Sequence, residues 1–307
     1  MQSPQILVVM PLYNARPFVR AAIESILAQT YPNFTLLVIN DGSTDGSEQE
    51  AASFQDRGVI LWSQENQGPG AAMNRAIQYA HDNQIQFIAR MDSDDILLPD
   101  RLEKQIILML KYPNSAACSA NCYYIDPSSE EIIGTSTVSS SNALIHWEIN
   151  HGLRGLIQPV CTFRTDPLYK IGGYRFEFKL AEETDVFLRL AETYDFCNSI
   201  DFLAKIRLNP KSLSMSNIDK NILYQFFALD CAAQRRKGKP ERDFDGFIQS
   251  MPSGTKYRIW REEVLLKLWR SQMQANRLPA LLLAGLIDPR RVAIRGLRKL
   301  DEIKRAS

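Results

Sequence analysis

The sequence predicts an α/β protein whose mostly parallel central sheet is flanked by helices and followed by a helical C-terminal extension. Three observations support this fold class. Four apolar segments of strand length recur within the first 91 residues, and each is followed by a turn rich in Gly, Pro, Asn or Asp. Apolar residues at helical spacing follow these turns, and beyond residue 215 only helical patterns remain. Strands that alternate with helices favour a parallel sheet with right-handed crossovers.

The elements can be taken in chain order. The run from Ile6 to Met10 is continuously apolar, which is typical of a strand covered on both faces. Pro17 suits the first turn of a helix, because its missing N–H would have no partner there. The remaining early strands are expected at 36–40, 59–62 and 86–91, and the helices at 17–27, 47–54, 70–80 and 102–110. Ligands of such sheets lie beyond the carboxyl ends of the strands, where three of these turns fall.

The later chain is less regular. Strands are expected near 117–125 and 131–138, and helices near 182–191, 217–236 and 256–275, whereas 139–157 shows no clear pattern. We therefore predict one α/β domain over 1–214, which divides near residue 113, and a helical extension over 215–307.

Composition places the chain among ordinary globular proteins, with 45% hydrophobic and 23% charged residues. The net charge of +1 hides an asymmetry, because residues 255–307 carry 13 Lys and Arg against 5 Asp and Glu. The five scattered cysteines form no CxxC pair, which favours reduced thiols in a cytoplasmic protein over a zinc site. We expect no signal peptide, and the apolar run 278–287 is too short to span a bilayer.

The segment Met91 to Asp95 is the strongest single indication of chemistry. Asp92, Asp94 and Asp95 are crowded where a buried strand gives way to a helix. Like charges at this spacing raise one another's pKa, and a divalent cation with oxygen ligands relieves the repulsion. An alternative remains for the motif alone, namely a solvated acidic turn that caps the next helix.

Several short motifs resemble, in order and spacing, those of the family 2 glycosyltransferases of GT-A fold. Each motif alone is weak, but unrelated patterns seldom coincide at these intervals. The resemblance covers residues 4 to 214. The motifs are Pro11-Leu12-Tyr13-Asn14, Asn40-Asp41-Gly42-Ser43-Thr44-Asp45, Asn66-Gln67-Gly68-Pro69-Gly70-Ala71-Ala72-Met73-Asn74-Arg75, Met91-Asp92-Ser93-Asp94-Asp95, Phe163-Arg164, Gly172-Gly173-Tyr174 and Glu182-Glu183-Thr184-Asp185.

The resemblance implies a catalytic domain with a donor-binding half over about 1–113 and an acceptor half over about 114–214. It implies that Asp41 hydrogen-bonds the base of a nucleotide donor, usually uridine. Asp94 or Asp95 would bind Mn²⁺ or Mg²⁺ on the diphosphate. The remaining donor contacts implied are Pro11, Tyr13, Asn14, Asn66, Gly68, Asn74, Arg75, Asp92 and Ser93. A plain loop and helix entry is the alternative for Asn66 and Gly68, and a surface ion pair is the alternative for Arg75.

The pair Glu182-Glu183 stands where the family more often has Glu-Asp, whose second acid is the general base. Transfer with inversion needs a carboxylate to take the proton of the acceptor hydroxyl. The resemblance therefore implies Glu183 as base, with Glu182 as second choice. Alternatively both acids simply occupy a first helical turn, where the macrodipole favours them.

Two acceptor-side positions depart from the family pattern. Asn209 and the segment Gln158-Pro159 stand where relatives often carry His, so the acceptor cannot be transferred by analogy. Arg207 has two open interpretations, since it could reach the diphosphate or brace the loop that closes the domain.

The basic tail is amphipathic. For 278–305 the Arg clustering favours peripheral association with an anionic membrane surface, whereas for 256–275 packing on the catalytic domain is favoured. The tail alone is weak evidence for nucleic acid, and we expect no nucleic-acid partner.

The sequence thus predicts a metal-dependent inverting glycosyltransferase at the inner face of the plasma membrane. Its substrates would be a nucleotide-diphospho-sugar donor and a glycan or lipid-linked glycan acceptor. An aspartyl-phosphate phosphatase would need its acidic motif after the first strand, and a nucleotidyltransferase would need a glycine-rich loop there; Pro11 to Arg16 supplies neither. A non-catalytic scaffold that binds a nucleotide-sugar remains the alternative.

Overall fold

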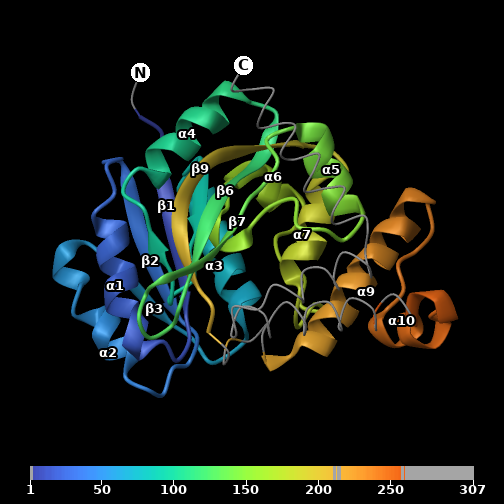
Figure 1. Ribbon diagram of the computed structural model, residues 1–307, viewed down its shortest axis with the longest axis horizontal. Helices are drawn as coiled ribbons and strands as arrows, with labels where there is room; N and C mark the ends of the chain where they lie inside the picture. Colours follow the sequence, from blue (N-terminus) through green and yellow to red (C-terminus); the bar gives the residue numbers. More distant parts are fainter. Residues whose placement is uncertain (1–2, 210–211, 213–215, 257–258, 260–307) are drawn as a thin grey trace. The chain divides into compact units, whose positions relative to one another are not determined.

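A computed structural model describes residues 3–209, 212, 216–256 and 259 (Figure 1). The chain forms two compact units. The first comprises Met1–Phe176 and Val186–Leu208, and the second comprises Glu177–Asp185 and Asn209–Ser307.

The first unit is built on a parallel sheet at its N-terminal side. Strands β1 (Ile6–Leu12), β2 (Phe34–Asn40), β3 (Ile60–Ser63) and β4 (Phe87–Arg90) lie in the order β3-β2-β1-β4, with every pairing parallel. All seven residues of β1 except Pro11 are buried, because both of its neighbours are strands and helices cover its two faces. The expected strands and their parallel arrangement are confirmed.

The sheet continues beyond β4 through strands that are distant in sequence. The full order is β3-β2-β1-β4-β8-β6-β9-β5, and β7 pairs with β6. The strand β6 pairs antiparallel with β8 and parallel with β9, while β4 pairs antiparallel with β8. The bounds are β5 (Ile96–Leu97), β6 (Ser115–Ile125), β7 (Ile132–Ser136), β8 (Thr162–Arg164) and β9 (Asp195–Arg207). The sequence predicts β6 and β7 but not β5, β8 or β9.

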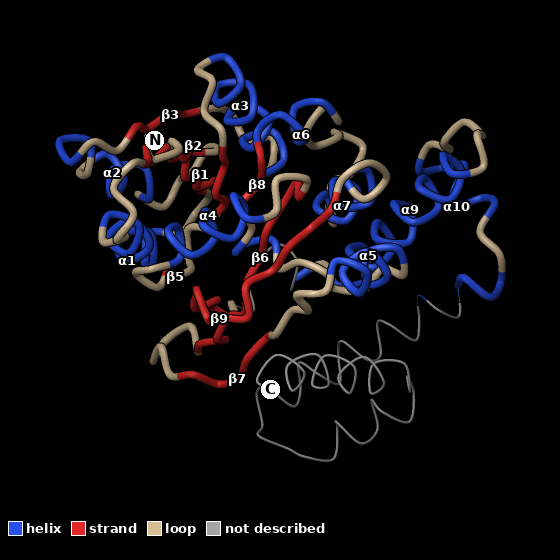
Figure 2. The backbone as a smooth tube through the Cα atoms, turned by 90° about the horizontal axis from the view of Figure 1, so that it is seen from above, coloured by secondary structure: helices blue, strands red, loops and turns tan. Residues whose placement is uncertain are grey.

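Helices cover both faces of the parallel strands. Figure 2 shows α3 and α6 on one side of β1, β2 and β8, and α1 and α4 on the other. The helix α1 turns Val19, Ala22, Ile23 and Ile26 inward at the spacing expected from the sequence. The helices of this unit are α1 (Arg16–Leu27), α2 (Ser47–Ala52), α3 (Pro69–Asp82), α4 (Arg101–Lys111), α5 (Asn142–Asn150) and α6 (Thr165–Lys170), with 3₁₀ turns η1 (Gln55–Arg57) and η2 (Gln158–Val160).

In the second unit, α9 (Ile218–Arg236) and α10 (Phe244–Ser250) pack around aromatic rings. Tyr224 stacks on Phe244 with ring centroids 4.5 Å apart, and Phe178 stacks on Phe227 at 4.9 Å. The side chain of Asp243 caps α10 by accepting from the Gly246 N–H at 2.8 Å. The helix α7 (Glu182–Leu190) begins in this unit and ends in the first.

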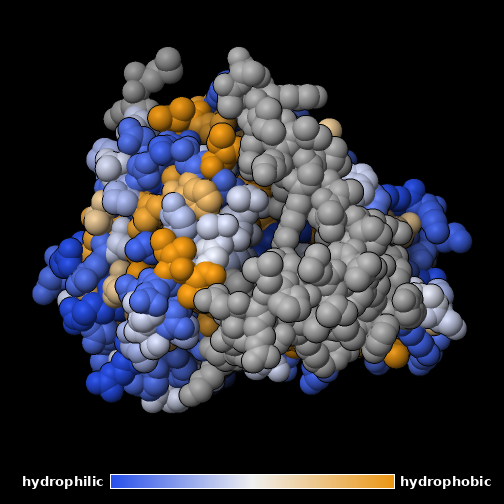
Figure 3. Space-filling view, viewed as in Figure 1, coloured by the Kyte–Doolittle hydropathy of each residue, from blue (hydrophilic) through white to orange (hydrophobic). Residues whose placement is uncertain are grey.

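The expected helix over 256–275 and basic tail over 278–305 lie outside the described residues, apart from positions 256 and 259. Among the helices that are described, none has the length and apolar character needed to cross a membrane. On the face in Figure 3, the coloured residues show hydrophobic groups interspersed with hydrophilic side chains.

Candidate functional site

Four loops follow the carboxyl ends of the parallel strands and meet at one edge of the sheet. Backbone hydrogen bonds tie their bases together. The N–H of Asp41 donates to the carbonyl of Leu12 at 2.8 Å, and the N–H of Gln64 donates to the carbonyl of Asn40 at 2.9 Å. This edge is where ligands of open α/β sheets bind.

Hydrogen bonds join the loop after β1 to the loop after β2. Asn14 has a left-handed backbone (φ 49°), and its side-chain oxygen accepts from the Thr44 N–H at 2.9 Å. The N–H of Asn14 in turn donates to the Ser43 hydroxyl at 3.1 Å. Pro11 is half-buried within β1, whereas the Tyr13 side chain is 52% exposed. Asn14 thus holds the loop in shape and leaves the Tyr13 ring open to a planar ligand.

Asp41 is buried at the end of β2, with 3% of its surface exposed. Its carboxylate accepts three hydrogen bonds, from the Gln64 side chain at 2.7 Å, the Gln67 N–H at 2.9 Å and the Gly68 N–H at 2.8 Å. Gly42 next to it has φ 78°, and a Cβ there would lie 3.1 Å from the Asn66 nitrogen. The second and third loops therefore approach too closely for a side chain at position 42.

Arg75 lies on α3 above the end of β3. One of its Nη atoms donates to the Gln64 side-chain oxygen at 3.0 Å, and its guanidinium lies 5.1 Å from the centre of the Trp62 ring. The ion pair offered as an alternative for Arg75 does not occur among the described residues. Asn66 is exposed and Gly68 adopts φ 88° immediately before α3, consistent with a loop that enters a helix.

Asn74 holds a distant turn against α3. Its side-chain amide donates to the Tyr174 carbonyl at 2.7 Å and accepts from the Tyr174 N–H at 2.8 Å. Gly173 at φ 64° permits this contact, since a Cβ there would lie 2.4 Å from the Asn74 side-chain oxygen. Both polar ends of the Asn74 amide are thus engaged within the protein.

The acidic loop follows β4. Asp92 accepts from the guanidinium of Arg90 at 3.1 Å, and Ser93 is buried. Burial and the nearby charge of Asp92 raise the pKa of Asp94 to about 6. Burial, followed by the charges of Asp94 and Asp92, raises the pKa of Asp95 well above its usual range. The crowding expected from the sequence therefore has an electrostatic cost in the folded protein.

Arg207, at the end of β9, braces this loop. Its backbone N–H donates to the Asp95 carboxylate and its Nε to the Asp94 carbonyl, both at 2.9 Å. Its two Nη atoms donate to the Pro127 carbonyl at 3.1 Å and to the Glu130 carboxylate at 2.6 Å. The sequence leaves open a contact with the diphosphate or a brace for the closing loop; the observed partners of Arg207 lie instead in the acidic loop and in the 127–130 turn.

Arg101 supports the loop from beneath. Its side chain is fully buried, and Nη2 donates to the carbonyls of Arg90 at 2.7 Å and Cys161 at 3.2 Å. Gln105 extends the support by donating to the Val160 carbonyl at 2.7 Å. Arg101, Gln105 and Gln64 belong to no motif recognised in the sequence. For Arg101 and Gln105 the available signal is a polar residue on the apolar side of a helix.

The acidic loop fits a divalent cation bound jointly with a diphosphate. One oxygen of the buried Asp95 carboxylate has no hydrogen-bond partner, and burial, followed by the charge of Asp92, raises the pKa of Asp94. No three His, Cys, Asp or Glu side chains within the described part of the chain form a complete metal site. Mg²⁺ commonly takes one or two carboxylates and draws its other ligands from water and phosphate, so the donor set is consistent with it.

Glu182 and Glu183 occupy the first turn of α7 together with Asp185, and this turn belongs to the second unit. Acidic side chains are favoured at this end of a helix. The placement agrees with the simple helix-start interpretation, and the role of Glu183 as base stays a prediction.

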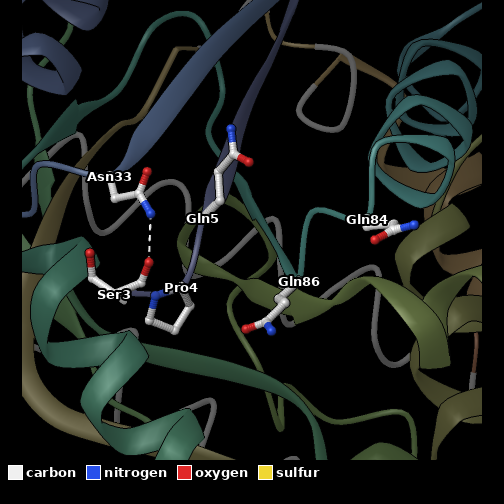
Figure 4. A pocket seen from close by; sticks show the side chains of 6 residues that line it. All are labelled: Ser3, Pro4, Gln5, Asn33, Gln84 and Gln86. Carbon is white, nitrogen blue, oxygen red and sulfur yellow. Dashed lines mark hydrogen bonds between the residues drawn. The ribbon is translucent and has the colours of Figure 1, made fainter. Parts of the chain in front are cut away.

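A separate hollow of about 620 Å³ lies at the opposite edge of the sheet (Figure 4). Its lining comes from residues before β1, β2 and β4, where Asn33 donates to the Ser3 carbonyl at 2.6 Å. The lining residues are Ser3, Pro4, Gln5, Asn33, Gln84 and Gln86. None of the residues singled out from the sequence lies there.

Comparison with known proteins extends this picture. An uncharacterized glycosyltransferase of Rickettsia typhi is 30% identical over 209 residues, which cover 62% of this chain and 61% of the relative. The UDP-Glc:alpha-D-GlcNAc-diphosphoundecaprenol beta-1,3-glucosyltransferase WfgD of Escherichia coli is 42% identical over 105 residues, covering 34% of this chain and 40% of the relative. The chain thus spans less than two thirds of these relatives' lengths.

Two solved structures share the fold. The TarS fragment 1–349 of S. aureus in complex with UDP-GlcNAc matches with TM-score 0.57 and 18% identity, covering 98% of this chain and 92% of that one. The mannosyltransferase PcManGT of Pyrobaculum calidifontis, in complex with GDP-Man and Mn²⁺, matches with TM-score 0.56 and 15% identity, covering 98% and 85%. The expected GT-A fold is confirmed. The pattern of Glycosyl transferase family 2 matches residues 7–171, and the chain belongs to that family.

Proposed function

We propose that this chain transfers a sugar from a nucleotide-diphospho-sugar, most simply a UDP-sugar, to a hydroxyl of a cell-surface polysaccharide or glycolipid. The observation that carries the proposal is the meeting of four loops at the carboxyl edge of the sheet, with Asp41 in one and the acidic loop 92–95 in another. The name of the Escherichia coli relative, which specifies UDP-Glc and a diphosphoundecaprenol-linked acceptor, supports the same substrate classes.

The donor would lie along this edge. Asp41 would accept from an N–H of the base, since an ionised carboxylate is an acceptor only. The exposed Tyr13 ring and Pro11 would cover the base, and Asp92 with Ser93 would contact the ribose. Asn66 and Gly68 would border these groups in direct contact. Asn14, Asn74 and Arg75 would border them by holding neighbouring loops and side chains in place.

Asp94, with Asp95 as the second candidate, would hold Mn²⁺ or Mg²⁺ together with the diphosphate oxygens. When bound, such a cation neutralises charge that develops on the leaving diphosphate. Arg207 would keep the Asp94 backbone in place through the carbonyl bond already described. The Mn²⁺ complex of the Pyrobaculum calidifontis neighbour supports a divalent metal at this fold.

Glu183 would act as general base, with Glu182 as the second candidate. It would take the proton of the acceptor hydroxyl while the oxygen attacks the anomeric carbon from the face opposite the diphosphate, which inverts that centre. The basic segment 278–305 would bring the protein to an anionic membrane surface that carries the acceptor. Flotation with anionic liposomes, with and without residues 278–307, tests this last point, and equal recovery would refute it.

The donor site is tested by calorimetric titration of the full chain with uridine diphosphate, with and without Mn²⁺. Binding to wild type that requires the metal, and that Asp94→Ala abolishes, is the expected result. Binding of no nucleoside diphosphate under either condition would overturn the proposal. Product analysis with a UDP-sugar and Glu183→Gln then separates catalysis from the alternative of a non-catalytic binding protein.

A further inference from the structure

Gln64 joins two residues that the resemblance treats separately. Its Nε2 donates to the Asp41 carboxylate at 2.7 Å, and its Oε1 accepts from Arg75 at 3.0 Å. The reversed amide would face an acceptor with an oxygen and a donor with a nitrogen, so only one orientation satisfies both neighbours. Arg75 therefore fixes which end of the Gln64 amide faces Asp41.

The hydrogen bonds around Asp41 leave one acceptor position and one donor position unused. Its Oδ1 accepts from Gln64 and the Gln67 N–H, while Oδ2 accepts only from the Gly68 N–H. An ionised carboxylate has about four lone-pair positions, which leaves one acceptor position on Oδ2. The Gln64 amide has two N–H groups, and one of them is used by Asp41. The hydrogen-bonded pair Asp41–Gln64 therefore keeps one acceptor position, on Oδ2 of Asp41, and one amide N–H of Gln64.

We propose that Gln64 and Asp41 together read the O=C–N–H edge of a uracil base, and that Arg75 is a positioning residue acting through Gln64. This inference rests on the proposed function and deepens it. Uracil offers an N–H to Asp41 and a neighbouring carbonyl to the second N–H of Gln64. Cytosine offers the opposite pair at this edge, a ring nitrogen without hydrogen and an amino group. Its ring nitrogen would face the Asp41 carboxylate, acceptor against acceptor, and its amino group would face the Gln64 N–H, donor against donor.

Base selectivity is the quantity to measure, because a general loss of protein stability weakens the binding of every nucleotide alike. We would titrate uridine diphosphate and cytidine diphosphate into the full chain with Mn²⁺ and compare their dissociation constants. Wild type should prefer uridine diphosphate. Gln64→Ala should reduce that preference about ten- to hundredfold, because the uracil carbonyl loses its hydrogen-bond donor. Glu65→Ala is the matched control, since Glu65 is an exposed residue of the same loop.

A double-mutant cycle tests the part played by Arg75. Arg75→Met should lower the preference for uridine diphosphate in the wild-type background and should change it no further once Gln64 is alanine. An independent loss in both backgrounds would show that Arg75 contacts the nucleotide itself and would overturn its positioning role.

The outcomes separate the inference from the function on which it rests. If wild type binds neither nucleotide, the donor site fails and the inference fails with it. If wild type binds both without preference, or if Gln64→Ala keeps the full preference, the donor site stands and the base-reading role of Gln64 is overturned. Guanosine diphosphate has a similar edge on a larger base, and preferred binding of it would refute uracil as the base.

Discussion

Arg207 fills a structural role that its position after a strand does not reveal. Its guanidinium donates to two backbone carbonyls and to Glu130, and it lies 4.6 Å from the centre of the Phe18 ring. We expect Arg207→Met to lower the free energy of unfolding by about 1–3 kcal/mol, because the part-buried carbonyls of Asp94 and Pro127 lose their donors. The Glu130 pair adds little, since Glu130 is 47% exposed.

Urea denaturation of Arg207→Met measures this loss. Arg207→Lys is the control, because an ammonium keeps the charge but cannot reach all three acceptors in a fork. It should recover only part of the stability. Full recovery by Lys would show that charge alone, not the fork of hydrogen bonds, supports the acidic loop.

Asp94 makes the protein's stability depend on pH. Its pKa is about 6 in the folded protein, raised by burial and by Asp92, against 3.8 for the free side chain. Between these values the folded state keeps a proton that the unfolded chain has lost, so the free energy of unfolding falls as pH rises through this window. With a chelator present, Asp94→Asn should flatten the fall and stabilise the protein at pH 7 by roughly 1–2 kcal/mol.

Denaturation at pH 4.5, 5.5 and 7 tests the Asp94 prediction. A mutant that is less stable than wild type at pH 7 without metal would contradict it. The expected gain in stability with loss of donor binding is typical of a site where function requires crowded charges.

At the scale of elements, two hydrogen bonds between Asn74 and the Tyr174 backbone hold the turn after α6 against α3, and Gly173 leaves room for them. Gly172 and Gly173 both have positive φ, at 77° and 64°, but only a Cβ at 173 would meet another atom within 4 Å. Gly172→Ala should therefore cost only the backbone strain, about 1–2 kcal/mol. Gly173→Ala should cost about 1–3 kcal/mol more, because the Asn74 side chain must move.

Thermal unfolding of the two glycine variants provides the comparison. Equal losses would show that backbone strain dominates and that the Asn74 contact is easily adjusted. The double variant Gly173→Ala with Asn74→Ala should recover part of the steric loss, since the clashing oxygen is removed.

The sequence predicts the strands that a local pattern marks, and it misses the strands whose polar residues find their hydrogen-bond partners far away in the chain. The strands β1 to β4 are continuous apolar runs followed by turn residues, and local pattern is enough to identify them. The strand β9 carries Asn198 and Ser199 in its middle, which locally indicate a loop. In the fold Asn198 is buried, and its side-chain amide donates to the Ser139 and Gly155 carbonyls, which lie 59 and 43 residues away in sequence. Only tertiary structure satisfies such a residue.

The residues of the candidate site also divide into those that the local sequence predicts and those that it does not. Asp41 follows β2, and Asp92 and Asp94 both follow β4, so the local sequence predicts that these carboxylates gather at one edge of the sheet. Gln64 and Arg101 take their roles from partners on other elements, and no local pattern marks those contacts. Glu182 and Glu183 lie beyond the residues 7–171 that the family pattern matches, so their assignment rests on the motif alone.

At the scale of the whole molecule, the five cysteines can report how the two units unfold. All five are buried. Cys118 and Cys122 on β6, Cys161 before β8 and Cys197 on β9 lie in the first unit, where one continuous sheet buries them. Cys231 lies on α9 in the second unit, which within its described part contains α9, α10, the start of α7 and an aromatic cluster but no strand. A helix pair of this kind has fewer long-range partners than the sheet and should open at lower free energy.

We therefore expect thiol labelling in rising urea to modify Cys231 before the other four cysteines. Peptide mapping by mass spectrometry after brief alkylation distinguishes the sites. Cys231→Ser should remove the early labelling step, because it removes the thiol that reacts first. A single transition in which all five thiols react together would contradict the prediction, and it would mean that the two units unfold as one cooperative body.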